Sequence, residues 1–394
     1  MRSVPLVLAT VLAGLAGAVL PTPALAADPP LPPTLPASRG PALHVAPTGH
    51  DRRGAGRLHD PLRTIEAALK RVRPGWRIVL HGGRYLERMD VRVRGTRTRP
   101  ITIEGARGDT ATIARGTRLE GASDVRIRNL TFDGSSSSDW GVFVFSSRRL
   151  EFAGNTMRNW RDGQGLLVAG GTDIRVIGNR MTNIDMPNFG HAHGIYCKQS
   201  RRLLIAGNLI WNNPDGFGVQ LFGDCDDTTI VHNTLHGNAT SGVTVGGNAE
   251  RGTSDNTLIA ENIITGHTGS TPNSQSGFGV AAYLNGANTM IRNNLFWGNA
   301  RGAVEPTCRD CLVENNIDAD PRYLDAAKGN FALGPDSAAL SRGAGGGLKV
   351  DAAGLPRVQG PAADLGALEA PDPAEAAARM VGRLAAALLA VAHS

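Results

Sequence analysis

The chain has 394 residues, of which 41% are hydrophobic and 19% charged, and 50 are glycine. This composition is typical of a folded globular protein and excludes a disordered or collagen-like chain. The 41 Lys and Arg residues outnumber the 35 Asp and Glu residues, and the net charge of +6 favours acidic partners in general. No Lys/Arg run with interleaved aromatic residues occurs, so we expect no nucleic-acid partner.

The N-terminal residues have the pattern of an export signal. A basic start at Arg2, an apolar stretch over residues 4–20 and a small-residue motif at 24–26 predict a signal peptide over residues 1–26. We therefore expect a secreted protein, extracellular or periplasmic. Residues 27–42 are rich in proline and are expected to form an extended linker that does not pack. Export permits disulfides, and two could form among the four cysteines, Cys197, Cys225, Cys308 and Cys311. Free buried thiols fit the sequence equally well.

Residues 59–75 predict a short capping helix. Asp60 is a suitable N-cap and Pro61 a suitable first helical residue. One apolar face follows, and the helix should stop before Pro74. The members of that face are Ile65, Ala68, Leu69 and Val72.

An internal repeat dominates the region from residue 124 to residue 317. Eight apolar strand-like segments each carry an asparagine, at intervals of 22 to 32 residues: Asn129, Asn155, Asn179, Asn208, Asn233, Asn262, Asn294 and Asn316. Between them recur glycines followed by alternating apolar residues, which is typical of half-buried strands. Short strands in repeats of roughly 25 residues predict an all-β parallel solenoid in which the asparagines stack in a ladder.

The two ends of such a solenoid need covering because strand edges and core would otherwise be exposed. We expect the helix near residue 65 at one end. The irregular, turn-rich residues 319–370 are expected to cover the other end. Residues 371–394 predict a helical tail whose apolar run, 384–392, is too short to span a bilayer. We therefore expect no transmembrane span, and a monomer.

The chain resembles the secreted right-handed parallel β-helix proteins of the pectate-lyase-like superfamily. The opening "HVAPTGHDRRGAGRLHDPLRTIEAALKRVRPGWRIVLHGGRYLE" is similar to the N-terminal cap of its chondroitinase B-like branch, and "DPRYLDAAKGNFALGPDSAAL" to the tail of many secreted members. The resemblance covers residues 43–370 and implies a single-stranded right-handed β-helix with a polysaccharide cleft on the Gly-strand sheet. It does not select a reaction, because the superfamily contains lyases, hydrolases, epimerases and binding proteins.

The Gly-strands predict which side chains face a substrate. The residue after each glycine should point inward, which gives only aliphatic residues: Val142, Leu166, Ile195, Val219, Val243 and Val280. Aromatic and polar residues then face outward or precede the glycines, and sugar rings stack on such surfaces. The predicted substrate-binding residues are Trp140, Phe143, His191, Arg201, Phe217, Gln220, Phe222 and Tyr283. Alternatively, long loops cover these aromatic residues.

Lys198 is one of only four lysines and falls on this outward face beside Tyr196 and His193. Eliminative cleavage of a uronate-containing glycan needs a base, a positive charge near the carboxylate and a proton donor. We assign Lys198 as the base and His193 or Tyr196 as the donor. Carboxylates could hold Ca²⁺ or simply form turns, and the candidates are Asp215, Asp224, Asp226 and Asp227.

The sequence thus favours a polysaccharide lyase that acts on an acidic glycan by β-elimination. A polygalacturonase-like hydrolase is an alternative, since "NPDG" and "DD" occur in the family's order, but "GHAHG" precedes them and no "RIK" follows. A uronate C5-epimerase would share the proton abstraction. A non-catalytic, adhesive glycan-binding protein of the cell envelope is the remaining alternative.

Overall fold

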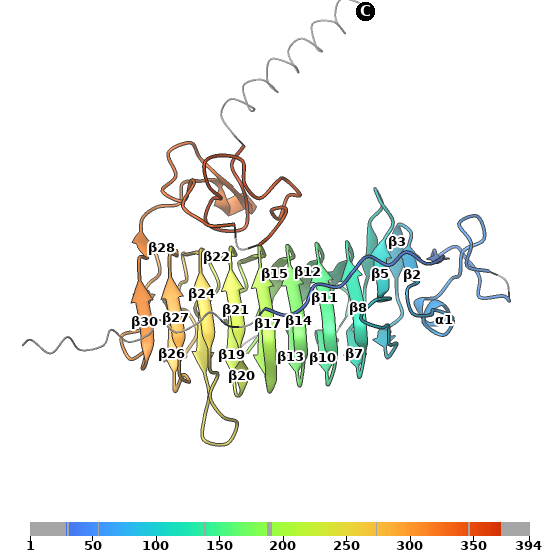
Figure 1. Cartoon of the computed structure of the whole chain (residues 1–394), viewed down its shortest axis with the longest axis horizontal. Helices are drawn as coiled ribbons and strands as arrows, with labels where there is room; N and C mark the ends of the chain where they lie inside the picture. The colour runs from blue at the N-terminus through green and yellow to red at the C-terminus, as the bar shows by residue number, and fades with distance from the viewer. Residues whose placement is uncertain are drawn as a thin grey trace, which may run out of the picture.

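The computed structural model describes residues 29, 31–53, 55–137, 139–186, 191–272, 274–345 and 347–371. The predicted signal peptide and the tail from residue 372 lie outside these residues. The described chain forms a parallel β-solenoid in which three long sheets run the length of the molecule (Figure 1). The all-β fold predicted from the repeat is therefore confirmed.

Most turns of the solenoid contribute one strand to each sheet, and the strand pairs between turns are parallel. The long sheet contains β1 (Ala42–Val45), β2 (Arg77–Leu80), β5 (Ile101–Gly105), β8 (Ser123–Arg128), β11 (Arg148–Ala153), β14 (Thr172–Ile177), β17 (Ser200–Ala206), β20 (Cys225–Asp226), β21 (Thr228–Val231), β24 (Thr257–Ala260), β27 (Thr289–Arg292) and β30 (Cys311–Glu314). The ten-stranded sheet contains β3 (Gly83–Tyr85), β6 (Ala111–Ile113), β9 (Thr131–Asp133), β12 (Thr156–Trp160), β15 (Arg180–Ile184), β18 (Leu209–Trp211), β22 (Thr234–His236), β25 (Ile263–Thr265), β28 (Leu295–Trp297) and β31 (Ile317–Asp318). The Gly-strand sheet contains β4 (Met89–Val91), β7 (Thr117–Glu120), β10 (Gly141–Phe145), β13 (Gln164–Ala169), β16 (Ile195–Lys198), β19 (Val219–Phe222), β23 (Val243–Gly246), β26 (Phe278–Tyr283) and β29 (Gly302–Val304).

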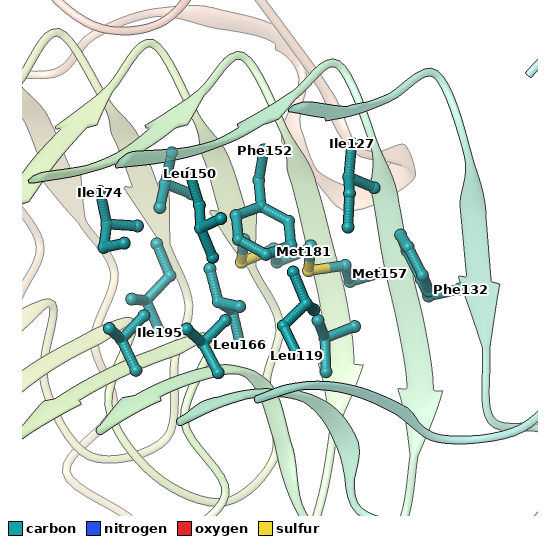
Figure 2. Packing of buried hydrophobic residues seen from close by; sticks show 14 of the residues in the cluster. Leu119, Ile127, Phe132, Leu150, Phe152, Met157, Leu166, Ile174, Met181 and Ile195 are labelled. Carbon is teal, nitrogen blue, oxygen red and sulfur yellow. The ribbon is translucent and has the colours of Figure 1, made fainter. Parts of the chain in front are cut away.

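The core is a set of side-chain stacks along the solenoid axis (Figure 2). In the Gly-strand sheet the predicted inward row is in register from Val142 to Val280, and every member is fully buried. Phe152 and Val176 continue such a stack in the long sheet, and Met157 and Met181 in the ten-stranded sheet. Alternation in the sequence thus fixes which face of each strand is buried.

The asparagine ladder is present, with one correction. From Asn155 to Asn316 each side-chain amide donates to the side-chain oxygen of the next asparagine at 2.9–3.0 Å. The rung before Asn155 is the backbone N–H of Leu130, not the side chain of Asn129. Asn129 has φ 54° and occupies the left-handed turn position that Gly154 fills in the next coil, so the predicted ladder was one member too long.

The first end of the solenoid is capped much as expected. Helix α1 (Ile65–Leu69) covers it, but it begins after Thr64, whose hydroxyl accepts the N–H of Ala67. The prediction of Asp60 as N-cap was wrong, because that carboxylate instead pairs with His50 at 2.8 Å.

The C-terminal segment does not cover the second end as predicted. It contains β32 (Tyr323–Asp325), the 3₁₀ turn η1 (Ala326–Lys328) and β33 (Asn330–Leu333), and it lies along the side of the solenoid (Figure 1). There Phe331 packs on Leu209, and Leu348 packs on the outer face of the long sheet. Val313, in the same inward row as Ile291, is consequently 47% exposed at the end of the described solenoid.

The described part of the proline-rich linker is extended but not free of the fold. It runs across the outer face of the long sheet, where Leu35 is buried. Arg126 donates to the carbonyl of Leu35 at 2.6 Å, and Arg175 to that of Pro32 at 2.9 Å. The expectation that this segment does not pack was therefore wrong, because its backbone carbonyls accept hydrogen bonds from arginines of the long sheet.

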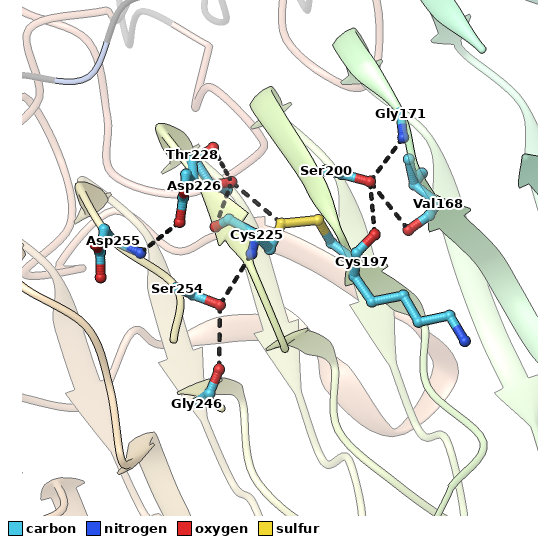
Figure 3. Close-up of a disulfide and its surroundings, with 11 residues drawn as sticks. Val168, Gly171, Cys197, Ser200, Cys225, Asp226, Thr228, Gly246, Ser254 and Asp255 are labelled. Atoms are coloured by element: carbon cyan, nitrogen blue, oxygen red, sulfur yellow. Dashed lines mark hydrogen bonds between the residues drawn. A yellow bond between two sulfur atoms is a disulfide. The ribbon is translucent and has the colours of Figure 1, made fainter. Parts of the chain in front are cut away.

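All four cysteines form disulfides. Cys308 and Cys311 bridge locally, whereas Cys197 and Cys225 join neighbouring turns of the solenoid, next to Ser200 and Thr228 (Figure 3). Both residues of the latter pair are fully buried. Of the two alternatives left open by the sequence, disulfides therefore apply rather than free thiols. No helix of the described chain is long and apolar enough to cross a membrane.

Candidate functional site

The outer face of the Gly-strand sheet carries the predicted outward rows in register. Phe143, Leu167, Tyr196, Gln220, Thr244 and Ala281 pair in sequence across six strands. A parallel row begins with Phe145, Ala169 and Lys198 and ends with Phe222, Gly246 and Tyr283. The alternation rule therefore placed both rows correctly.

Aromatic side chains are accessible mainly at two places on this face. Trp140 is 64% exposed and stacks on Phe143 with ring centres 5.9 Å apart, while Arg118 lies 4.9 Å over the ring of Phe145. These residues line a shallow hollow together with Asp139, whose carboxylate is held by Arg88 and Arg115. Further along, Tyr283 is 48% exposed, and Gln220 and Phe222 are half-buried.

Three of the predicted site residues, Phe217, His193 and Asp215, are buried instead. Phe217 is 1% exposed and packs on His193, so it cannot offer a stacking surface. The row just before the glycines is otherwise also covered, because Gln164, Ser241 and Phe278 are buried. Trp140 is thus the member of this row with an exposed side chain.

His193 is a buried, positioned histidine. Its Nδ1 accepts the N–H of Phe217 at 3.0 Å, so its proton lies on Nε2, and its own N–H donates to Gln164 at 2.8 Å. Burial, reinforced by His191, lowers the pKa of His193 to about 3. At neutral pH the ring is uncharged, and it fixes the ring of Tyr196 by an edge contact at 5.5 Å between centres.

Tyr196 and Lys198 lie together on the open face. The Nζ of Lys198 is 5.9 Å from the centre of the Tyr196 ring. Burial raises the pKa of the Tyr196 phenol, and Arg251, which bonds to the hydroxyl, partly opposes that shift. The phenol is therefore protonated at neutral pH, and Arg251 and Lys198 lie beside it.

Arg251 is a site residue that the sequence did not reveal. It belongs to the loop between β23 and β24, and its side chain packs against the backbone at Gly223. Only the folding of that loop brings it to Tyr196, more than fifty residues earlier in the chain. In the sequence it stands next to Glu250 in a Gly-rich turn outside the repeated strands, so the repeat pattern does not mark it as a site residue.

Carboxylates gather on the opposite side of the site, where the ten-stranded sheet turns into the Gly-strand sheet. Asp215 is buried, and its Oδ2 accepts the N–H of His191 at 3.3 Å. Burial and the nearby charge of Asp215 raise the pKa of Asp185, the residue after β15. His191 itself is exposed beside His193, with ring centres 6.4 Å apart.

The remaining aspartates, at the turn that follows β19, mainly build local structure. Asp226 accepts the N–H of Asp255 at 2.9 Å, and Asp227 accepts the amide of Asn256 at 3.1 Å. Asp224 is exposed and lies in a left-handed turn conformation. Across the residues that the structure describes, no three His, Cys, Asp or Glu side chains are grouped to hold a metal.

Comparison with known proteins bears on the fold. A family described as "Right handed beta helix region" matches residues 115–271, so the solenoid is a right-handed parallel β-helix. No curated protein matches the chain.

Among solved structures, the chain is similar to pectate lyase Pel9A, at 18% identity and a TM-score of 0.56, over 85% of this chain and 97% of that one. At this identity the likeness shows the fold. It is also similar to an alginate lyase from Paenibacillus sp. str. FPU-7 (14% identity, 71% and 99% of the two chains, TM-score 0.46). A third is PfbA, a surface adhesin of Streptococcus pneumoniae (13%, 64% and 74%, TM-score 0.48).

Proposed function

We propose that this protein is a secreted polysaccharide lyase that cleaves an acidic, uronate-containing glycan by β-elimination. The observation that carries the proposal is the grouping of Lys198, Tyr196 and Arg251 on the aromatic face of the Gly-strand sheet. The similar lyase Pel9A supports the reaction class by its name. Two disulfides support an exported protein, because they persist in oxidising compartments.

The three residues have complementary roles in this reaction. Lys198, as the neutral amine, removes the proton from C5, the carbon next to the carboxylate. Arg251 offsets the negative charge that develops on the carboxylate. The bond from C4 to the leaving oxygen breaks, a C4–C5 double bond forms, and Tyr196 gives its proton to the leaving oxygen. His193 then acts as a positioning residue rather than the donor, because a histidine with a pKa of about 3 is neutral at neutral pH, and a neutral imidazole is too weak an acid to protonate the leaving oxygen.

The hydrolase remains a second candidate because of one observation, the acidic pair. Burial and Asp215 raise the pKa of Asp185, and a glycoside hydrolase uses two carboxyl groups of which one, the general acid, has a raised pKa. The epimerase and the adhesive binding protein share the surface but not the products.

Product chemistry distinguishes these functions. Purified protein is given a panel of uronate polymers, and ultraviolet absorbance of the unsaturated product and release of reducing ends are followed together. We expect both signals, and a loss of at least about 100-fold in rate for Lys198→Ala and for Tyr196→Phe. Lys70→Ala is the matched control, since Lys70 is exposed on the N-terminal cap and pairs with Glu66 of the same helix turn.

Each alternative has its own outcome. Reducing ends without absorbance, lost in Asp215→Asn, would replace the lyase with a hydrolase. Altered stereochemistry without cleavage would indicate the epimerase, and binding without any product would indicate the adhesive protein. Assays with calcium and with a chelator test the Ca²⁺ hypothesis, in which Asp224, Asp226 and Asp227 would act together with carboxylates of the glycan.

A further inference from the structure

Two neighbouring rows of charged residues run along the turn between the Gly-strand sheet and the long sheet. The first row alternates in sign: Asp124, Arg149, Asp173, Arg202 and Asp227. Arg149 binds Asp124 at 2.6 Å, and Arg202 binds Asp173 at 2.7 Å. Charges in this row are therefore neutralised from one coil to the next, as expected for structural ion pairs.

The second row lies one residue earlier in each coil and is not neutralised. Its members pair in register as Ser123, Arg148, Thr172, Arg201 and Asp226. Arg148 and Arg201 are exposed, and within the described residues no ion pair or hydrogen bond of either guanidinium is found. Arg94 forms a β-bridge with Ser123 and so extends the row, and its Nε–H donates to the carbonyl of Gly121.

These three arginines, the arginine rim, border one hollow. Arg94, Arg148 and Arg201 line it together with the polar residues Ser147 and Thr172. Successive arginines are two coils apart, which corresponds to roughly 10 Å at about 4.8 Å per strand. The rim thus presents regularly spaced cations along the solenoid axis, whereas a structural role would have given each arginine an acidic partner, as in the first row.

The rim runs directly beside the proposed site. Arg201 follows Lys198 by three residues, and Arg148 follows Phe145 by three residues. The row ends at Asp226, where further acidic residues follow the same turn. A negatively charged chain would therefore be attracted along the rim as far as the coil that carries Lys198 and repelled beyond it.

We infer that the arginine rim is a binding site for the charged groups of an acidic glycan that lies along the solenoid axis. The inference rests on the proposed function, because it concerns the same surface, and it assigns a substrate class: a linear polyanion, held over several coils. A glycan fits better than a nucleic acid, because the aromatic residues beside the rim are half-buried in a shallow face suited to sugar rings, not to splayed bases.

The test compares Arg148→Gln/Arg201→Gln with Arg52→Gln/Arg53→Gln. Both double variants remove two positive charges, and Arg52 and Arg53 are exposed near the N-terminal cap. Affinities for polygalacturonate, hyaluronan and neutral dextran are measured in the Tyr196→Phe background, so that no polymer is cleaved. We expect about tenfold weaker binding of at least one acidic polymer for the rim variant only, and a difference that shrinks at high salt.

Unchanged affinity of the rim variant relative to the Arg52/Arg53 control would overturn the inference. The inference would also be overturned if single-stranded DNA of the same charge bound as tightly as the acidic polymers and lost the same affinity in the rim variant. Turnover separates the two proposals, since weaker binding by the rim variant together with no unsaturated product from the wild-type protein on any polymer supports the rim and refutes the lyase. Product from the wild-type protein with unchanged rim affinity would support the lyase and refute the rim.

Discussion

Replacing His267 with asparagine should remove a specific source of acid sensitivity. A second ladder runs inside the turn before the Gly-strand sheet: Asn213 donates to Asn238 at 2.7 Å, Asn238 N–H to Nδ1 of His267 at 3.1 Å, and His267 N–H to Asn299 at 3.2 Å. His267 thus occupies an asparagine position. Its ring is fully buried, and its Nε2 has no partner in the described structure.

The size of the effect follows from the pKa of this ring. Burial lowers the pKa of His267 from 6.5 to about 3, so the folded protein does not take up the proton that the unfolded chain binds below pH 6.5. A histidine with a lowered folded pKa gives full stability above 6.5 and loses it as the pH falls towards 3. At pH 5.0 only the unfolded chain binds this proton, and the free energy of unfolding is lowered by about 2 kcal/mol. At pH 7.5 the same effect is about 0.1 kcal/mol.

Urea unfolding at the two pH values measures the difference. Between pH 7.5 and 5.0 the free energy of unfolding of His267→Asn should fall by about 2 kcal/mol less than that of the wild-type protein, because Asn can accept the Asn238 N–H and does not titrate. His59→Asn, at an exposed position, should behave like the wild type. Equal pH dependence of His267→Asn and wild type would refute the assignment of a neutral, buried His267.

Three further predictions concern the scaffold and are measured by urea unfolding. Asn208→Ala leaves the Asn179 N–H and the Val176 carbonyl without partners and should cost at least about 3 kcal/mol. The control Asn212→Gly, at an exposed position whose φ of 48° glycine tolerates, should cost little, and equal losses would contradict the ladder's role. Cys197→Ser/Cys225→Ser opens a cross-link of sequence separation 28 and should cost roughly 3–4 kcal/mol, an effect that a reductant should reproduce in the wild type. Ile291→Ala should cost about 3–4 kcal/mol and Val313→Ala under about 1 kcal/mol, and similar losses would mean that the last coil is covered.

The fold could be predicted because every coil repeats the same physical instructions. Alternation placed Val142 and its equivalents inward, and stacked asparagines satisfy the turn that links the long sheet to the ten-stranded sheet. The errors fall where one position tolerates two solutions. Asn129 looks like a ladder member, but asparagine also tolerates the left-handed conformation that glycine adopts at that position.

The site was less predictable because its depth depends on loops rather than strands. Periodicity correctly placed Tyr196 and Lys198 outward. It could not show that Phe217 and His193 are covered, or that Arg251 returns to Tyr196 from a distant turn. Loop conformations follow from tertiary contacts, and these leave no regular mark in one sequence.

The charges on the two borders of the Gly-strand sheet fit the proposed position of the reactive residues. One border is acidic, with Asp185 and Asp215, and the other is basic, with Arg148, Arg201 and Lys198. A polyanion placed on this sheet is repelled by the first border and attracted by the second, so its carboxylates move towards Lys198. The same polarity disfavours hydrolysis of a uronate at Asp185 and Asp215, because the acidic border would have to accept a negatively charged ring. Acidic polymers should therefore bind more tightly as ionic strength falls, and a neutral glycan with the same linkage should show no such dependence.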